Sequence, residues 1–213
     1  GQGWYTDYPS ADRNLMIRLS ELTTTHVGFD ERDEPDHVVL RLSDDALFNY
    51  PFIFMSDVGT LRLSELEVGR LRDYLLKGGF LWVDDFWGSH AWDQWVWEIS
   101  KVLPPGAYPI VDIAMDHPIN KGMFEVTTIP QIPSIQHWRR SGGSTTSERG
   151  YKSADVHLRG ITDDDGRLLV LMSHNTDIAD GWEREGEDYE FFYRFSIDAY
   201  AVGINFVVHA MTY

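Results

Sequence analysis

Apolar residues in the first half of the chain occur both as short continuous runs and at helical spacing. The runs 52–55 and 80–83 are typical of strands that are buried on both faces. Between them, Val68, Leu71 and Leu75 recur at the spacing of one face of a helix. Strands that alternate with helices in this way predict an α/β fold with helices on both faces of a sheet.

Capping and turn residues mark the ends of several elements. Ser64 and Glu67 have the spacing of a capping box and predict the start of the helix between the two runs, and the glycine pair 78–79 predicts its end. Apolar residues return at helical spacing over 92–102, directly after the second run. A last helix is predicted over 197–211, where apolar residues again share one face.

Three further segments give shorter patterns. Ser10 can cap a first helix that extends to Leu22. The segment 38–42 alternates apolar and polar residues and predicts a strand, and 108–113 predicts another.

The second half of the chain combines an irregular region with a hairpin. The pattern dissolves at about 127–155, which predicts a long irregular insertion of the kind that often forms functional lids. Segments 156–161 and 168–172 flank the turn signal at 165–166 and predict an antiparallel hairpin at one edge of the sheet. We therefore expect a single domain over residues 1–213, built on an open, mostly parallel sheet.

Composition narrows the classes of partner. The chain has 34 acidic and 18 basic residues, and a formal net charge of -16 disfavours binding to nucleic acid. No run of about 18 apolar residues is present, so we expect no membrane span in this segment. The chain begins with glycine and has no cysteine, so we expect a piece of a longer precursor without disulfides or thiolate sites.

Several longer stretches resemble a known bacterial family. The stretches are YPSADRN, LRDYLLKGGFLWVDDF, DHPI, DGRLLVLMSHNTDIADGWE and AVGINFVVHAMT. Together they resemble the family catalogued as domain of unknown function 4159, in the class I glutamine amidotransferase-like superfamily. The resemblance implies a flavodoxin-like fold and covers nearly the whole chain. Members of the family often look exported, which implies a periplasmic or extracellular location.

The same resemblance argues against amidotransferase activity. In true amidotransferases, the strand that corresponds to 80–84 leads to a cysteine nucleophile. Here Asp84, Asp85, Phe86 and Trp87 occupy that position, and the chain has no cysteine. Hydrolysis of glutamine through a thioester is therefore excluded.

Four residues at predicted strand ends are the catalytic candidates. Asp84 and Asp85 point to opposite faces of a strand, so at most one of them faces a given pocket. His117 and His174 each follow an apolar strand and could reach the same edge of the sheet. Histidines and carboxylates that converge there could act as acid and base or bind a divalent metal, although their spacing matches no known ligand signature and no cofactor is evident.

A second set of residues near the same predicted edge are candidates for binding a ligand. His90 lies at the start of the helix over 92–102, where the helix dipole favours a neutral imidazole. Trp182 and Glu183 combine an aromatic face with a carboxylate, as sugar sites do, although a tryptophan that anchors a loop is as common. The remaining candidates flank the two strand ends: Trp87, Asn175 and Asp177.

The sequence leaves two classes of function open. The leading hypothesis is a module that binds a polar small molecule, for which a carbohydrate is one candidate, or a protein partner. The alternative is a hydrolase that uses the strand-end aspartates and histidines, with or without a divalent metal. The two differ in whether the candidate side chains meet at one point.

Overall fold

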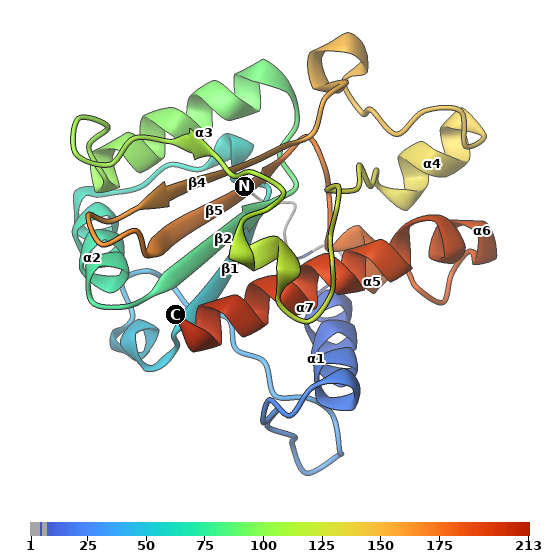
Figure 1. Ribbon diagram of the computed structural model, residues 1–213, viewed down its shortest axis with the longest axis horizontal. Coiled ribbons are helices and arrows are strands. Elements are labelled where there is room, and N and C mark those ends of the chain that lie inside the picture. The colour runs from blue at the N-terminus through green and yellow to red at the C-terminus, as the bar shows by residue number, and fades with distance from the viewer. Residues whose placement is uncertain (1–4, 6–7) are drawn as a thin grey trace.

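The computed structural model describes residues 5 and 8–213. Its centre is a mixed five-stranded open sheet in the order β1-β2-β5-β4-β3 (Figure 1). β1, β2 and β5 are mutually parallel, whereas β4 runs antiparallel to both β5 and β3. The strands span Phe52–Ser56 (β1), Phe80–Asp84 (β2), Val111–Asp112 (β3), His157–Thr162 (β4) and Leu168–His174 (β5).

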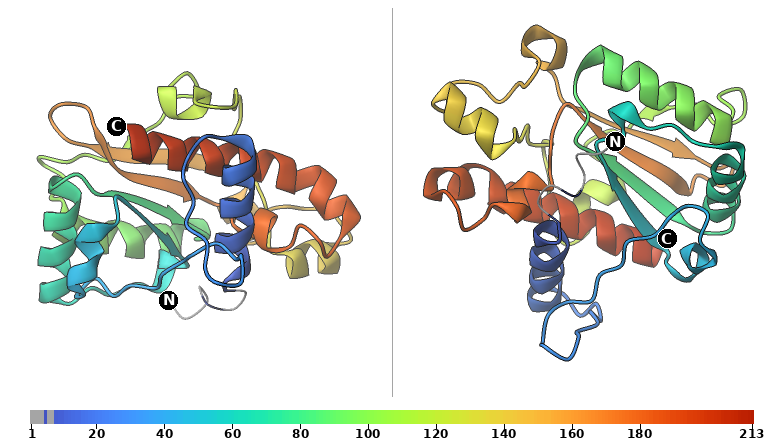
Figure 2. Two further views of the ribbon diagram at one scale, coloured as in Figure 1. Left: turned by 90° about the horizontal axis from the view of Figure 1, so that it is seen from below. Right: turned by 180° about the vertical axis from the view of Figure 1, so that it is seen from behind.

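Helices cover both faces of the sheet, as Figure 2 shows. They span Ser10–Leu22 (α1), Glu65–Leu76 (α2), Gly88–Val102 (α3), Ile135–Ser141 (α4), Asp180–Glu183 (α5), Tyr189–Phe191 (α6) and Ile197–Thr212 (α7). Residues of α2 and α3 form one apolar core with one face of the sheet, and residues of α1, α5 and α7 form a second core with the other face. The α/β class and the open sheet that the sequence predicts are confirmed.

Strand β2 shows how the sequence determines these two cores. Leu81 and Val83 belong to the core beneath α2 and α3, whereas Phe80 and Trp82 belong to the core beneath α7. All of β2 is buried, because β1 and β5 flank it and helices cover both of its faces. The alternation continues to the end of the strand and therefore places Asp84 on the side of Trp82.

The predicted helix ends agree well with the structure where capping residues are present. Ser64 and Glu67 form the full capping box at the start of α2. The final helix α7 and the helix α3 also lie where the apolar spacing predicts them. At α1, however, Pro9 occupies the capping position and Ser10 is the first helical residue, without a side-chain cap.

Of the predicted strands, one is absent and another is much shorter in the structure. Residues 38–42 are not a strand, and Val38 and Val39 are about half exposed, so their alternation has no sheet to pack against. The predicted strand 108–113 is reduced to the two residues of β3. β1 is an edge strand of intermediate burial rather than a buried one.

The predicted hairpin does not lie wholly at the edge of the sheet, and the predicted irregular region contains helical turns. β4 and β5 form an antiparallel pair, but β5 lies in the middle of the sheet, next to β2. The antiparallel edge consists of β4 and β3 instead. The region 127–155 contains α4 and a short 3₁₀ turn at Gly150–Ser153.

Candidate functional site

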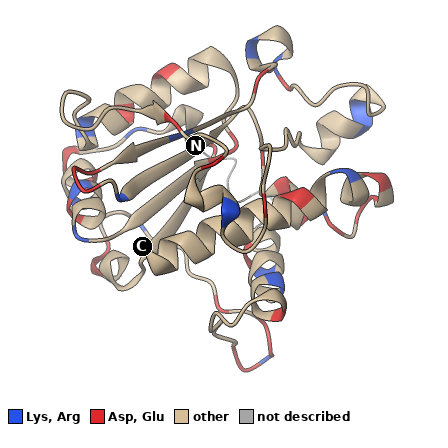
Figure 3. Cartoon of the chain, viewed as in Figure 1, with Lys and Arg blue, Asp and Glu red and all other residues tan. Residues whose placement is uncertain are grey.

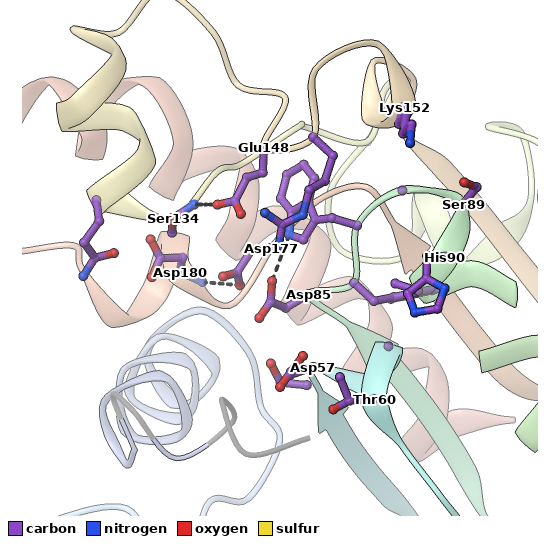
Figure 4. A pocket seen from close by; sticks show the side chains of 18 of the residues that line it. Asp57, Thr60, Asp85, Ser89, His90, Ser134, Glu148, Lys152, Asp177 and Asp180 are labelled. Carbon is purple, nitrogen blue, oxygen red and sulfur yellow. Dashed lines mark hydrogen bonds between the residues drawn. The ribbon is translucent and has the colours of Figure 1, made fainter. Parts of the chain in front are cut away.

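A cavity of about 690 Å³ lies beyond the carboxyl ends of β1, β2 and β5 (Figure 4). Its residues come from the turns after β1 and β2, the start of α3, the region 134–152 and the loop that follows β5. Ligands of open α/β sheets bind at this edge, where parallel strands end and helices begin. The sheet therefore brings segments that are distant in the sequence to one place.

The three parallel strands end in the same way. Asp57, Asp85 and Asn175 directly follow β1, β2 and β5, and each has a left-handed backbone, with φ of 53°, 52° and 66°. Aspartate and asparagine adopt this conformation more readily than other side chains of their size. Because Ser56 pairs with Asp84 in the register of β1 and β2, Asp57 and Asp85 leave the sheet side by side.

Asp85 is held at the floor of the cavity by its neighbours. The indole of Trp87 donates a hydrogen bond to the Asp85 carboxylate at 2.9 Å, and the Asp85 amide donates to the carbonyl of Thr176 at 3.2 Å. Burial and the nearby carboxylates of Glu148 and Asp57 raise the pKa of Asp85 to about 6. Asp85 can therefore change its charge close to neutral pH.

Asp177 faces the same space from the loop after β5 (Figure 4). Its carboxylate accepts a hydrogen bond from the amide of Asp180 at 3.0 Å. Burial raises the pKa of Asp177 well above its usual range, and the neighbouring carboxylates of Asp85 and Asp180 raise it further. A group that offers positive charge or hydrogen-bond donors would relieve this repulsion.

The opposite wall of the cavity has a different character. Helix α3 begins there, and Trp87 at its capping position makes no side-chain cap. The Gly88 amide instead donates to the side chain of Asn175, after β5, at 2.8 Å. Ser89 and His90 line the wall beside it. The exposed side chains Arg149 and Lys152 also line this wall, so the cavity combines a carboxylate floor with a basic rim.

Few charged residues lie within the strands of the sheet (Figure 3). Charged residues lie mainly on the loops and helices around the sheet, as Figure 3 shows. Asp84 is an exception because it lies within β2 and is fully buried.

Asp84 faces away from the cavity and fastens the loop after β5. Its carboxylate accepts hydrogen bonds from the Ser173 hydroxyl at 2.5 Å and from the amide of Ala179 at 3.1 Å. Burial raises the pKa of Asp84 to about 8. Of the adjacent aspartates, only Asp85 lines the cavity, as the alternation of a strand requires.

The two histidine candidates do not join Asp85. The ring of His117 lies 6.0 Å from that of His209, and His209 in turn lies 6.2 Å from Phe80, at the amino end of β2. After the short strand β3, the chain crosses the face covered by α7, where Ile119 is buried. The expected convergence of His117 with the carboxyl ends of the strands therefore does not occur.

His174 is buried on the other side of α3's first turn. Its ring packs against Phe86 and Trp92 at 4.9 and 5.0 Å between centroids, and its Nε2 lies 3.2 Å from the carbonyl oxygen of Gly88. Burial lowers the pKa of His174 to about 4. His174 supports the wall of the cavity but does not line it.

Among the predicted ligand-binding residues, the tryptophans offer no open platform. Trp182 is 2% exposed and packs on Phe54 and Trp82, so it anchors α5 to the core. Trp87 is 8% exposed and is bound to Asp85. Glu183 lines the cavity. Asn175 instead joins the start of α3 to the segment before β4, because its side chain accepts a hydrogen bond from the Gly88 amide and donates one to the carbonyl of Asp155.

Several lining residues are not among the candidates that the sequence predicts. Asp57 had a usable signal, because it follows an apolar run just as Asp85 does. Glu148, Arg149 and Lys152 come from the irregular region, where no periodicity indicates which side chains turn inward. Ser134, which caps α4, also lines the cavity.

No three histidine, aspartate or glutamate side chains among residues 5 and 8–213 are arranged to hold a metal ion. Over the same residues, no helix has both the length and the apolar character that a bilayer span needs.

Nearly the whole chain corresponds to one family. The chain matches the family described as Domain of unknown function (DUF4159) over residues 1–211. It belongs to this family. The comparison with curated proteins found no match. The DUF4159 match spans every element that forms the cavity, from the turn after β1 to α5.

Proposed function

We propose that this domain binds a small polar molecule in the cavity at the carboxyl ends of β1, β2 and β5. The observation that carries the proposal is the placement of Asp57, Asp85 and Asp177 in one cavity. Carboxylates that raise one another's pKa are stabilised by a ligand that brings positive charge or several hydrogen-bond donors. A volume of about 690 Å³ is in the range of cavities that bind small molecules.

The character of the lining favours a charged ligand over a neutral sugar. Sugar sites commonly present an open aromatic face, but Trp87 and Trp182 are both buried. The floor instead offers carboxylates, and the rim offers Arg149 and Lys152. We therefore place small amines, guanidinium compounds and amino acids ahead of neutral carbohydrates as ligands.

Calorimetry with a panel of these compounds and of simple sugars tests the proposal at pH 7.5. We expect at least one cationic compound to bind, and Asp85→Asn to weaken its affinity by at least about tenfold, because a charge-assisted hydrogen bond is lost. Affinity should also fall below pH 6, because protonation removes the charge of Asp85.

The matched control is Asp73→Asn, which removes an exposed carboxylate from α2. Binding should be unchanged in this variant. A ligand whose affinity is the same for the wild type and for Asp85→Asn would contradict the proposed site. Binding of neutral sugars alone would contradict the preference for charge.

A hydrolase is the second candidate, and the raised pKa of Asp85 favours it. A carboxyl group with a pKa of about 6 can donate and accept protons near neutral pH, as general acids do. Asp177 would then be the partner carboxylate, rather than His117 or His174. Turnover of chromogenic glycosides, esters or phosphates with a pH limb near 6 that Asp85→Asn removes would support this candidate.

We also propose a superfamily to which this domain belongs. We place the domain among the class I glutamine amidotransferase-like proteins, supported by parallel strands β1, β2 and β5 between two helical layers. The chain has no cysteine, so it cannot use the thiolate chemistry of those enzymes.

A further inference from the structure

One wall of the cavity is a segment with unusual composition. Residues 142–153, here called the strap, connect α4 to the segment before β4 and supply Glu148, Arg149 and Lys152 to the cavity. Figure 4 shows Glu148 and Lys152 above the floor formed by Asp85 and Asp177. The strap thus forms part of the wall around the proposed binding groups.

The strap has almost no apolar anchor. Tyr151 is its one large apolar side chain, and it is 88% exposed. Ser153 is buried, and its hydroxyl bonds within the strap, to the amide of Arg149 and the hydroxyl of Ser147. A segment held by few apolar contacts opens at a lower free-energy cost than the core.

Glycines lie near both ends of the strap. Gly142 and Gly143 have φ of 59° and 73° after the last turn of α4, and Gly150 has φ of 58° near the other end. Backbones with positive φ are accessible to glycine without strain. These glycines therefore place little conformational restriction on the backbone near the ends of the strap.

The side chain of Gln131 links the strap to the residue that follows β5. The Gln131 Oε1 atom accepts a hydrogen bond from Thr146 at 2.7 Å, and its Nε2 atom donates to the carbonyls of Ser153 at 2.8 Å and Asn175 at 3.0 Å. Gln131 thus joins the middle and the end of the strap to the residue that follows β5. Apart from local bonds to Ser141 at its start, the strap makes one further side-chain hydrogen bond to the rest of the described chain, in which the Ser134 amide donates to Glu148 at 2.8 Å.

We propose that the strap is a gate over the cavity and that Gln131 is its latch. This inference rests on the proposed function, because the gate controls access to the carboxylate floor. Repulsion between Glu148 and Asp85 favours the open state of the empty cavity. A cation between them attracts both carboxylates and favours the closed state, which gives the ligand the differential affinity that a population shift requires.

Limited proteolysis with trypsin tests the latch without any ligand. Arg149 and Lys152 are exposed cleavage sites within the strap, and Lys77 after α2 is an exposed internal reference. Cleavage follows the population of the opened segment when opening is fast. We expect Gln131→Ala to raise the rate at Arg149 and Lys152 by about tenfold, as the loss of one to two net hydrogen bonds predicts. The rate at Lys77 should not change.

Two more variants make the test specific. Gln94→Ala removes a glutamine of α3 whose side chain donates to the carbonyl of Leu61 at 2.8 Å, and it should leave cleavage of the strap unchanged. Thr146→Val removes one bond to the latch, leaves Gln131 in place, and should raise cleavage of the strap about threefold. Equal rates for the wild type and Thr146→Val would overturn the inference, as would an equal rise at Lys77 in Gln131→Ala.

The experiments test the proposed gate and the proposed binding site separately. Faster cleavage of the strap in Gln131→Ala supports the latch even if no compound of the calorimetric panel binds. Conversely, a ligand that binds through Asp85 but gives no protection of Arg149 and Lys152 from trypsin would overturn the gate and leave the proposed binding intact.

Discussion

Asp84 and Asp85 are adjacent in the sequence, but their carboxylates meet different surroundings. Asp84 is fully buried and accepts hydrogen bonds from Ser173 and Ala179, whereas Asp85 lines the cavity. The difference follows from the alternation of a strand and from the left-handed backbone of Asp85. One carboxylate therefore stabilises the fold, and its neighbour is available to a ligand.

The hydroxyl of Ser173 is central to the buried group around Asp84. It donates to Asp84 and accepts a hydrogen bond from the indole of Trp82 at 2.8 Å. Ser173→Ala would leave two buried polar groups without this partner, and we expect a loss of about 2–3 kcal/mol in the free energy of unfolding. Urea denaturation measures this loss.

A serine on the surface provides the control for this prediction. Ser144 makes one exposed hydrogen bond, to the carbonyl of Ser141. Ser144→Ala should change the free energy of unfolding by less than about 0.5 kcal/mol. Similar values for the two variants would show that the buried hydroxyl contributes no more than an exposed one.

At the scale of elements, the order of helices and strands could be predicted where apolar runs and capping residues agree. The capping box at Ser64 and the buried run 80–83 each specify one local structure, and both occur as predicted. The segment 38–42 has strand-like alternation, but no neighbouring strand pairs with it. Pairing is a tertiary property, so short patterns of this kind cannot be settled from local sequence.

The site was less predictable than the fold for the same reason. Asp85 and Asp177 could be chosen because they follow strands, and both line the cavity. His117 also follows a strand, but its segment crosses to the far end of the sheet beside His209. Glu148 and Arg149 lie in an irregular region, where tertiary hydrogen bonds rather than periodicity orient the chain.

The contact between α5 and α7 gives a prediction at this scale. A methyl group on Gly203 of α7 would lie 2.3 Å from the indole of Trp182, so Gly203→Ala must displace a buried ring. We expect a loss of about 1–3 kcal/mol in stability from this overpacking. Thermal or urea unfolding of the variant measures it.

The same substitution in another helix should have the opposite sign. Gly69 lies within α2, and a methyl group there would meet no atom within 4 Å. Gly69→Ala should raise stability by up to about 1 kcal/mol, because alanine favours the helix. Equal effects at the two positions would argue that packing between α5 and α7 does not limit stability.

At the scale of the whole molecule, buried ionisable groups act in opposite directions on stability. Burial lowers the pKa of His174 and His209 to about 4, so their contribution to stability is lost as the pH falls from about 6.5 toward 4. Burial raises the pKa of Asp84 to about 8, so its contribution is lost as the pH rises. Above pH 6.5 the folded histidines are neutral and the unfolded ones lose their remaining charge, which adds little, so the raised carboxyl groups dominate between pH 6.5 and 8.

We therefore expect the domain to be less stable at pH 8 than at pH 6.5. The folded state holds the Asp84 proton while the unfolded state has released it, and linkage gives a loss of about 2 kcal/mol over this interval. Asp177, whose pKa is also raised, acts in the same direction. Urea denaturation at a series of pH values measures the slope.

Asp84→Asn separates this contribution from the others. The amide is neutral at every pH, and it can accept a hydrogen bond from the amide of Ala179 while donating to the Ser173 hydroxyl, which also lies 3.2 Å from the carbonyl oxygen of Val83. The variant should show a shallower decline between pH 6.5 and 8, because it lacks the proton that the folded state holds on Asp84, and the remaining decline belongs to Asp177 and the cavity carboxylates. An undiminished decline in Asp84→Asn would assign it to Asp177 and the cavity carboxylates instead, and the burial of Asp84 would then be independent of pH in this range.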